Sequence, residues 1–232
     1  MTVDERTVAW YRCYLFGRFV LGVSHEVDNY MSVILGFAEL LKMYPREEEK
    51  VVSSVEKIIR SADALSEMFK TFAFHAKTEP DDVTVFSMSE LIDSLFSFAG
   101  YDLKRGGVEL EKKLQGDDFS LKGDRRTVSL ILLSLMLNAA ESMREGGGLL
   151  TVEVARKGEG GIVKIVDRGE GIPSHLQEKV FEPFFTTREE PFRLGLGLSV
   201  SRFLLEKMGG KLKLVSREDE GTTVEAFFPF SS

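Results

Sequence analysis

One histidine stands in a setting that favours chemistry at its ring. His25 is followed directly by Glu26, and Asn29 comes one turn later in a stretch with helical periodicity. A carboxylate beside an imidazole can orient the ring or take its proton, which helps one ring nitrogen attack as a nucleophile. Asn29 could orient a water near the same nitrogen. Taken alone, these residues are also compatible with an exposed histidine that has no function.

Two further stretches carry residues suited to a nucleotide. Asn138 lies in an otherwise apolar helical stretch, where a buried amide needs partners and Mg²⁺ with phosphate oxygens would supply them. Asp167 follows a predicted strand and could accept a hydrogen bond from an exocyclic amine such as adenine N6. Gly169 and Gly171 would let the backbone approach a flat ligand. Each pattern also has a plainer interpretation, as a core amide bonded to backbone or as an ordinary polar turn.

A pair of glycines opens the last predicted helix. Gly195 and Gly197 place glycine-rich backbone at a helix N-terminus, which favours phosphate. The stretch is not a P-loop, because G-x-x-x-x-G-K-[ST] is absent. It is not the dinucleotide-binding G-x-G-x-x-G either, because Val200 replaces the third glycine. By itself the pair is a weak signal.

The element that must position His25 is a helical hairpin. Up to residue 76 the apolar residues recur every three and four positions, which predicts two antiparallel helices joined by a short turn at Pro45. His25 falls between the seam positions Val23 and Val27, about 160° away from either. Its helical neighbours are small or polar: Gly22, Asp28, Asn29, Ser32 and Gly36. We therefore expect His25 on an outer face that leaves room for a large partner.

The hairpin also predicts a partner for itself. Two helices bury little apolar area, so we expect a second copy to complete a dimeric four-helix bundle. The alternative is a hairpin packed on its own C-terminal domain. From residue 77 the pattern alternates between strands and helices, with strands near 83–86, 108–114, 149–155, 161–166, 211–216 and 222–228 and helices near 87–104, 125–143 and after Gly197. The expected domains are thus a helical hairpin at 1–76 and an α/β domain at 77–232.

Composition excludes several classes of protein. The chain has 232 residues, is 43% hydrophobic and carries a net charge of −7, the wrong sign for a mainly electrostatic nucleic-acid binder. A run of about 18 uncharged apolar residues is missing, so we expect no membrane span. The single cysteine, Cys13, excludes an internal disulfide and fits a reducing compartment. We expect a cytoplasmic protein in which the stretch before His25 has no room for a sensor domain.

Taken in their order, these stretches resemble the sequence boxes of the two-component sensor histidine kinases, over about residues 15–230. The matching segments are Ser24–Asn29 for the H-box, Asn138–Glu141 for the N-box, Asp167–Pro173 for the G1 box, Phe181–Thr187 for the F-box, Gly195–Ser199 for the G2 box and Gly221–Thr223 for the last glycine box. Each box is a weak motif, and their common order makes the resemblance specific.

The resemblance implies a dimerisation and phosphotransfer hairpin followed by an α/β sandwich of the Bergerat (GHKL) type that binds ATP and Mg²⁺. It implies that His25 accepts the phosphoryl group with Glu26 as base, and that Asn138 ligates the metal. It also implies that Asp167 reads adenine. The other implied nucleotide contacts are Gly169, Gly171, Phe184, Arg188, Gly195, Gly197, Leu198 and Thr223, with residues 186–194 as a mobile lid.

The implied partners are a response regulator and a sensor. The phosphoryl group would pass from His25 to an aspartate of a receiver domain, and a separate protein would supply the input. The alternative is that the chain is a fragment of a longer kinase. Glu26-x-x-Asn29 also fits the pattern by which some members of the family dephosphorylate their regulators.

Three positions depart from the family pattern. Tyr30 replaces the usual proline of the H-box, which predicts a straighter helix. Ser134 replaces the first asparagine of the N-box, and Arg193 replaces the first glycine of the G2 box. The departures keep open a phosphotransfer adaptor or pseudokinase with little ATP turnover. A second alternative is an ATPase of the same superfamily with another acceptor, against which the H-box argues.

Overall fold

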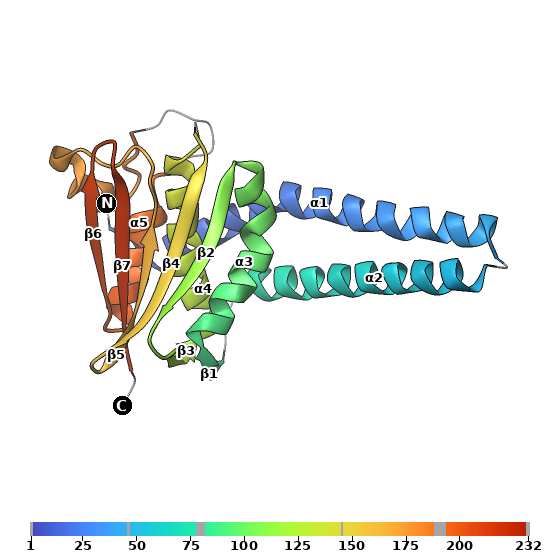
Figure 1. Ribbon diagram of the computed structural model, residues 1–232. Coiled ribbons are helices and arrows are strands. Elements are labelled where there is room, and N and C mark those ends of the chain that lie inside the picture. The colour runs from blue at the N-terminus through green and yellow to red at the C-terminus, as the bar shows by residue number, and fades with distance from the viewer. Residues whose placement is uncertain (1, 46, 78–81, 145, 188–193, 231–232) are drawn as a thin grey trace. The chain divides into compact units, whose positions relative to one another are not determined.

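The chain forms two compact units, each described here by itself. The computed structural model describes residues 2–45, 47–77, 82–144, 146–187 and 194–230 (Figure 1). One unit is Phe16–Lys77, and the other joins Met1–Leu15 to Thr78–Ser232. The expected domain boundary after residue 76 therefore lies close to a division of the structure. The sequence prediction did not separate residues 1–15 from the hairpin.

The first unit is the predicted antiparallel helical hairpin. Helix α1 spans Glu5–Met43 and continues from the second unit into the first, and α2 spans Glu48–Ala76 (Figure 1). Phe16 and Phe72 meet edge to face near the open end of the hairpin, with ring centroids 6.4 Å apart. Near the turn, the Lys57 ammonium lies 4.5 Å from the centre of the Phe37 ring. These contacts hold the two helices side by side.

A five-stranded mixed sheet forms the centre of the second unit. Its strands are β2 (Val108–Gln115), β4 (Gly148–Lys157), β5 (Gly160–Val166), β7 (Gly221–Pro229) and β6 (Lys211–Arg217), in that spatial order. β2 and β4 run parallel, and the remaining pairs are antiparallel. Helices α3 (Met88–Arg105), α4 (Arg125–Ser142) and α5 (Gly197–Lys207) lie together against the sheet (Figure 1). The predicted α/β sandwich is confirmed.

Alternation along the strands separates the two faces of this sheet. On the helix side, β4, β5 and β7 bury Leu150, Val152, Val154, Val163, Ile165, Val224, Ala226 and Phe228. On the other side, Glu153, Lys164, Glu225 and Lys213 form one row across four strands. The Lys164 ammonium lies 3.7 Å from a Glu225 carboxylate oxygen in this row. The period of two thus places the core under the helices and a charged surface opposite.

The central helix, α4, begins at a strong cap. The Asp124 carboxylate accepts hydrogen bonds from the backbone N–H groups of Arg126 and Thr127, which satisfies two unpaired donors of the first turn. From Val128 to Leu137 every residue is buried, as expected for a helix covered on all sides. α4 is therefore a fixed support for the side chains it carries.

A small second sheet was only half predicted. β1 (Val83–Ser87) pairs antiparallel with β3 (Ser120–Asp124), and β3 was not predicted because Leu121 is its only large apolar residue. Short 3-10 turns at Ser174–Leu176 and Lys179–Phe181 follow β5. Within the described ranges, none of the helices combines the length and apolar character that crossing a membrane requires.

Candidate nucleotide and phosphotransfer sites

One stripe of α4 carries three polar side chains four residues apart. Ser134, Asn138 and Ser142 fall on the same face, because four residues make slightly more than one turn. The stripe runs about 12 Å along the helix axis from Ser134 to Ser142. Each of its ends contacts a different one of the predicted nucleotide motifs.

The Ser134–Asn138 end of the stripe lies against the start of α5. The Ser134 hydroxyl donates to the Gly197 carbonyl at 3.1 Å. A β-carbon added at Gly197 would lie 2.7 Å from Asn138 Nδ2 and 2.9 Å from Asn138 Oδ1. Glycine at position 197 therefore lets the helix N-terminus approach the Asn138 amide, and a larger residue would have to displace that amide. The predicted phosphate and metal residues are neighbours here.

The Ser142 end of the stripe holds Asp167. One carboxylate oxygen, Oδ1, accepts hydrogen bonds from Ser142 Oγ at 3.0 Å, from Gly169 N at 2.9 Å and from Thr222 N at 3.2 Å. Asp167 is 5% exposed. Three donors from three different segments fix the orientation of this buried carboxylate. Its neighbours Ser142 and Thr222 were not predicted, although Ser142 follows Asn138 by one helical turn.

The glycines of the turn after β5 pack closely against the chain itself. A β-carbon at Gly169 would lie 2.1 Å from Ser142 Oγ. Gly171 has φ +67°, and a β-carbon there would overlap the Arg217 carbonyl. The structure thus gives these glycines a packing reason, whereas the sequence analysis assigned them to the approach of a ligand. Their role at the base stays a prediction.

The F-box and G2 segments meet at the backbone. Phe184 donates its N–H to the Gly195 carbonyl at 2.9 Å, and a β-carbon at Gly195 would lie 2.4 Å from the Phe185 carbonyl oxygen. Phe184 itself has φ +67°. The contact joins the residues that flank the stretch predicted as a lid, 186–194. Arg188 and Arg193 lie outside the described residues.

One predicted contact is not brought to this cluster. Thr223 pairs with Val166 and shares the charged face of the sheet with Glu225, on the side away from the helices. Thr222, one residue earlier, points to the helix side and donates its backbone N–H to Asp167. Leu198 is half-buried in the first turn of α5.

His25 lies on α1 in the hairpin unit and is exposed, as predicted. Asn29 is exposed one turn later, and Glu26 is half-buried. A β-carbon at Gly36, further along the same helix, would meet no atom within 4 Å. The helix surface beyond His25 is therefore open to an approaching group.

The residues present fit a metal held jointly with phosphate. Asn138 is half-buried among fully buried neighbours, and its amide makes no hydrogen bond to another described side chain or backbone group. No cluster of three His, Cys, Asp or Glu side chains suited to a metal occurs among the described residues. An amide oxygen beside a helix N-terminus suits Mg²⁺, which takes few protein ligands and keeps phosphate oxygens and water.

The chain is similar in sequence to proteins of known families. Residues 123–232 match the family described as histidine kinase-, DNA gyrase B- and HSP90-like ATPase. Sporulation kinase A of Bacillus subtilis is 27% identical over 215 residues, which cover 92% of this chain and 34% of that protein. Sensor histidine kinase ZraS of Escherichia coli is 24% identical over 95% of this chain and 50% of its own length. The chain thus spans about a third to a half of these relatives.

Solved structures agree with the sequence comparisons. The catalytic domain of the histidine kinase ThkA superposes with a TM-score of 0.58 and 28% identity, over 64% of this chain and 96% of that domain. ThkA in complex with the response regulator protein TrrA matches 96% of this chain and 64% of that chain with a TM-score of 0.56 and 23% identity, which supports the fold.

Proposed function

Because this chain is a relative of the two-component sensor histidine kinases and its residues 123–232 belong to the histidine kinase-, gyrase B- and HSP90-like ATPases, we propose that it is an ATP-dependent protein-histidine kinase. ATP binds along α4, and His25 accepts the γ-phosphoryl group. The relatives are named as kinases, and the proposal assigns the same activity to this chain.

The polar stripe of α4 is the observation that carries this proposal. Ser142 and Asp167 lie at one end of it, and Asn138 lies beside the N-terminus of α5 at the other. We assign the adenine to Asp167, whose carboxylate accepts from the exocyclic amine. We assign the phosphates to Gly195, Gly197 and the first turn of α5, where backbone N–H groups and the helix dipole favour negative charge.

The proposed reaction is an in-line phosphoryl transfer. An imidazole nitrogen of His25 forms a bond to the γ-phosphorus while the bond from that phosphorus to the β,γ-bridging oxygen breaks and ADP leaves. Glu26 takes the proton that the imidazole loses. Catalysis rests on positioning and on neutralisation of phosphate charge, so the nucleotide of one unit and His25 of the other must meet.

Asn138 is the side chain we assign to Mg²⁺. The ion, held together with the phosphates, would supply positive charge where negative charge accumulates during transfer. Ser134, one turn earlier, keeps the start of α5 in place through the Gly197 carbonyl.

We further propose that phosphorylated His25 serves a response regulator. The exposed surface around His25 and Asn29 offers a docking site, and the ThkA–TrrA complex is a structural neighbour in which a kinase of this fold holds a response regulator. If the kinase also dephosphorylates the regulator, Asn29 would orient the attacking water.

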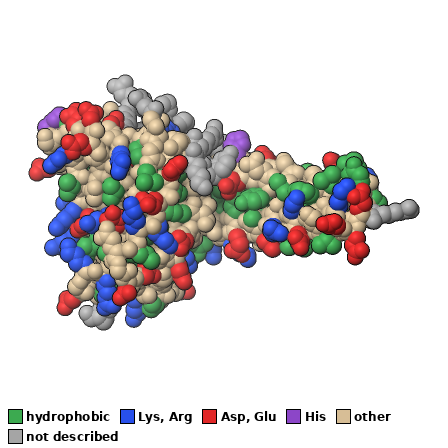
Figure 2. Space-filling view, in the orientation of Figure 1, with side chains coloured by type: hydrophobic (Ala, Val, Ile, Leu, Met, Phe, Trp, Pro, Cys, Tyr) green, Lys and Arg blue, Asp and Glu red, His purple; other side chains and the backbone are tan. Residues whose placement is uncertain are grey.

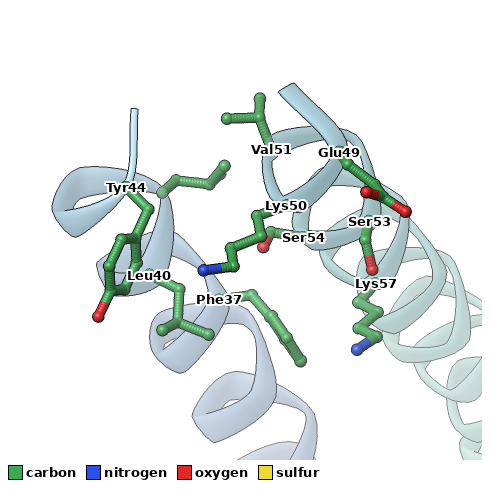
Figure 3. A pocket seen from close by; sticks show the side chains of 10 residues that line it. Phe37, Leu40, Tyr44, Glu49, Lys50, Val51, Ser53, Ser54 and Lys57 are labelled. Atoms are coloured by element: carbon green, nitrogen blue, oxygen red, sulfur yellow. The ribbon is translucent and has the colours of Figure 1, made fainter. Parts of the chain in front are cut away.

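The hairpin is proposed to pair with a second copy. Large apolar side chains stay 38–57% exposed along both of its helices, at Val20, Met31, Val33, Leu35, Leu40, Val52, Val55, Ile59 and Phe69. Figure 2 shows apolar patches between the charges of the hairpin. Near the turn, Phe37 and Leu40 from α1 and Lys50 and Lys57 from α2 border an open cavity of about 550 Å³ (Figure 3). A second hairpin would cover this surface and complete a four-helix bundle.

The proposal is tested by incubating the chain with Mg²⁺ and γ-labelled ATP. We expect incorporation of label that is stable to base and labile to acid, and loss of that label in Asn138→Ala. Gln115→Ala, an exposed amide of the same unit, is the matched control and should label normally. A chain that binds no ATP would overturn the proposal. A chain that binds ATP and stays unlabelled would favour the phosphotransfer adaptor.

A further inference from the structure

The second unit, Met1–Leu15 with Thr78–Ser232, is called the catalytic unit from here on. It includes the first residues of α1, although these lie outside the segment that matches the ATPase family. Asp4 starts the helix by accepting hydrogen bonds from the backbone N–H and the hydroxyl of Thr7, at 2.8 and 2.7 Å. Residues 5–15, which we call the docked segment, form the first three turns of α1. Sequence analysis gave them no function.

One face of the docked segment is a buried apolar stripe. Val8, Tyr11 and Leu15 are 6%, 4% and 1% exposed and fall three and four residues apart. Arg6, Trp10 and Cys13 lie on the opposite side and are exposed. The segment therefore packs on the unit through one apolar face, as an amphipathic helix does.

A hydrogen-bonded relay connects this stripe to the nucleotide site. Tyr11 and Ser134 share a hydrogen bond of 2.7 Å between their hydroxyl groups. Since Ser134 gives its single proton to the Gly197 carbonyl, Tyr11 must be the donor in this pair. The relay ends at the first residue of α5, against which the Asn138 amide packs.

Charged groups hold the two ends of the docked segment. Glu5 pairs with Lys207 in the last turn of α5. The Arg12 guanidinium is 5% exposed and is attracted by the Asp124 carboxylate that caps α4. Burial lowers the pKa of Arg12 and Asp124 opposes that effect, as expected when a buried cation has a nearby anion.

The docked segment changes the connectivity of the molecule. The chain leaves the catalytic unit at residue 15, forms the hairpin and re-enters the catalytic unit at residue 78. The catalytic unit is thus joined to the hairpin at two points, whereas without docking it would be joined at one. Two connections leave fewer relative orientations than one. The proposed transfer needs the catalytic unit to bring ATP to a histidine on a hairpin.

We propose that residues 5–15 are a restraining segment, which holds the catalytic unit through Tyr11, Val8 and Leu15 and whose release raises the rate of His25 phosphorylation. This inference rests on the proposed kinase function. A sensor that pulled the start of α1 away would then act as an activator.

The only cysteine gives a direct measure of docking. Cys13 is exposed on the docked segment and can carry a nitroxide without disturbing the buried face. Val8→Asp places a charge in that face, and Arg6→Asp places the same charge on the exposed side of the same turn. Tyr11→Phe removes only the hydroxyl that bonds Ser134.

We expect an immobile nitroxide in the parent chain and in Arg6→Asp, and a mobile one in Val8→Asp. The initial rate of phosphorylation should rise in Val8→Asp, and Tyr11→Phe should shift the docking equilibrium by about 2- to 10-fold, the effect of one net hydrogen bond. A mobile label with an unchanged or lower rate would overturn the restraint, as would an immobile label in Val8→Asp. If no variant and no parent chain is phosphorylated, the proposed function itself fails while the label still reports docking.

Discussion

The α-carbon of Gly197 lies against the side chain of Asn138, so closely that a β-carbon at position 197 would come within 2.7 Å of Asn138 Nδ2. This contact joins the start of α5 to the polar stripe of α4. It places a helix N-terminus beside the only amide that we assign to a metal. The proposed phosphate site depends on this contact between Asn138 and the N-terminus of α5.

Gly197→Ala should therefore damage nucleotide binding more than folding. The methyl group must displace the Asn138 amide or the first turn of α5, at a cost of about 1–3 kcal/mol in unfolding free energy. We expect the affinity for Mg·ATP to fall more than about 10-fold, which corresponds to 1.4 kcal/mol. Calorimetric titration and denaturant unfolding measure the two effects.

Gly36→Ala is the matched control for this substitution. Its new β-carbon meets no atom within 4 Å, so ATP binding should be unchanged. Replacing a helical glycine by alanine should raise the unfolding free energy by about 0.5–1 kcal/mol. Equal affinity for ATP in Gly197→Ala and in the parent chain would remove the assignment of phosphate to this turn.

Asp167→Asn should separate base recognition from folding. The amide oxygen of asparagine can still accept from Ser142, Gly169 and Thr222, so the fold should survive. The amide nitrogen would face the exocyclic amine of adenine with a donor, so ATP binding should fall by at least about 10-fold, the loss of a hydrogen bond to a charged group. Discrimination between ATP and GTP should weaken as well.

Asp167→Ala provides the contrast. It leaves three donors at a buried position without their acceptor, and each unpaired group costs about 1–3 kcal/mol. We expect a clearly lower melting temperature together with the loss of ATP binding. If Asp167→Asn kept full affinity and full preference for ATP, the adenine would have to bind elsewhere.

Glu26→Gln should slow phosphorylation without affecting ATP binding. Glutamine keeps the shape of the side chain and cannot take a proton, and loss of a general base costs about 10²- to 10⁴-fold in rate. Asp28→Asn changes an exposed carboxylate two residues later and should label at the parental rate. The rate of phosphorylation is measured by rapid-quench incorporation of label. Equal rates in the two variants would exclude Glu26 as the base.

Ala62→Asp should weaken the proposed pairing of hairpins. Ala62 is exposed on the apolar seam of α2, and a charge buried there without a partner is unfavourable. Arg60→Asp places a carboxylate two residues earlier, about 160° around the helix, at a side chain that is 76% exposed, and should leave the dimer intact. Sedimentation equilibrium would show a monomer for the first variant and a dimer for the second. A monomeric parent chain would contradict the bundle.

The periodicity of the sequence was sufficient for the large elements. The hairpin and the strands that alternate apolar and charged residues were predicted because one buried face demands a regular spacing. α4 was predicted from its continuous apolar run. β3 was missed because a five-residue strand with one large apolar residue carries no such signal. Asp167 and Asn138 were selected as candidates because a lone polar residue beside an apolar element is conspicuous.

The residues that were missed depend on register and on long-range contact. Thr223 was predicted at the nucleotide, and the structure places Thr222 on the helix side of β7. A strand reverses its faces with each residue, so a motif cannot decide between neighbours. Tyr11 meets Ser134 across 123 residues of sequence, and no local pattern indicates such a pair.

Localisation of the phosphoryl group tests the central claim most directly. The chain is incubated with Mg²⁺ and γ-labelled ATP beside His25→Ala and His175→Ala, the latter an exposed histidine of the catalytic unit, and the phosphorylated peptide is sequenced at alkaline pH. The account predicts phosphohistidine at position 25, absent from His25→Ala and undiminished in His175→Ala. Label that persists in His25→Ala, or that maps to any other residue, would contradict it.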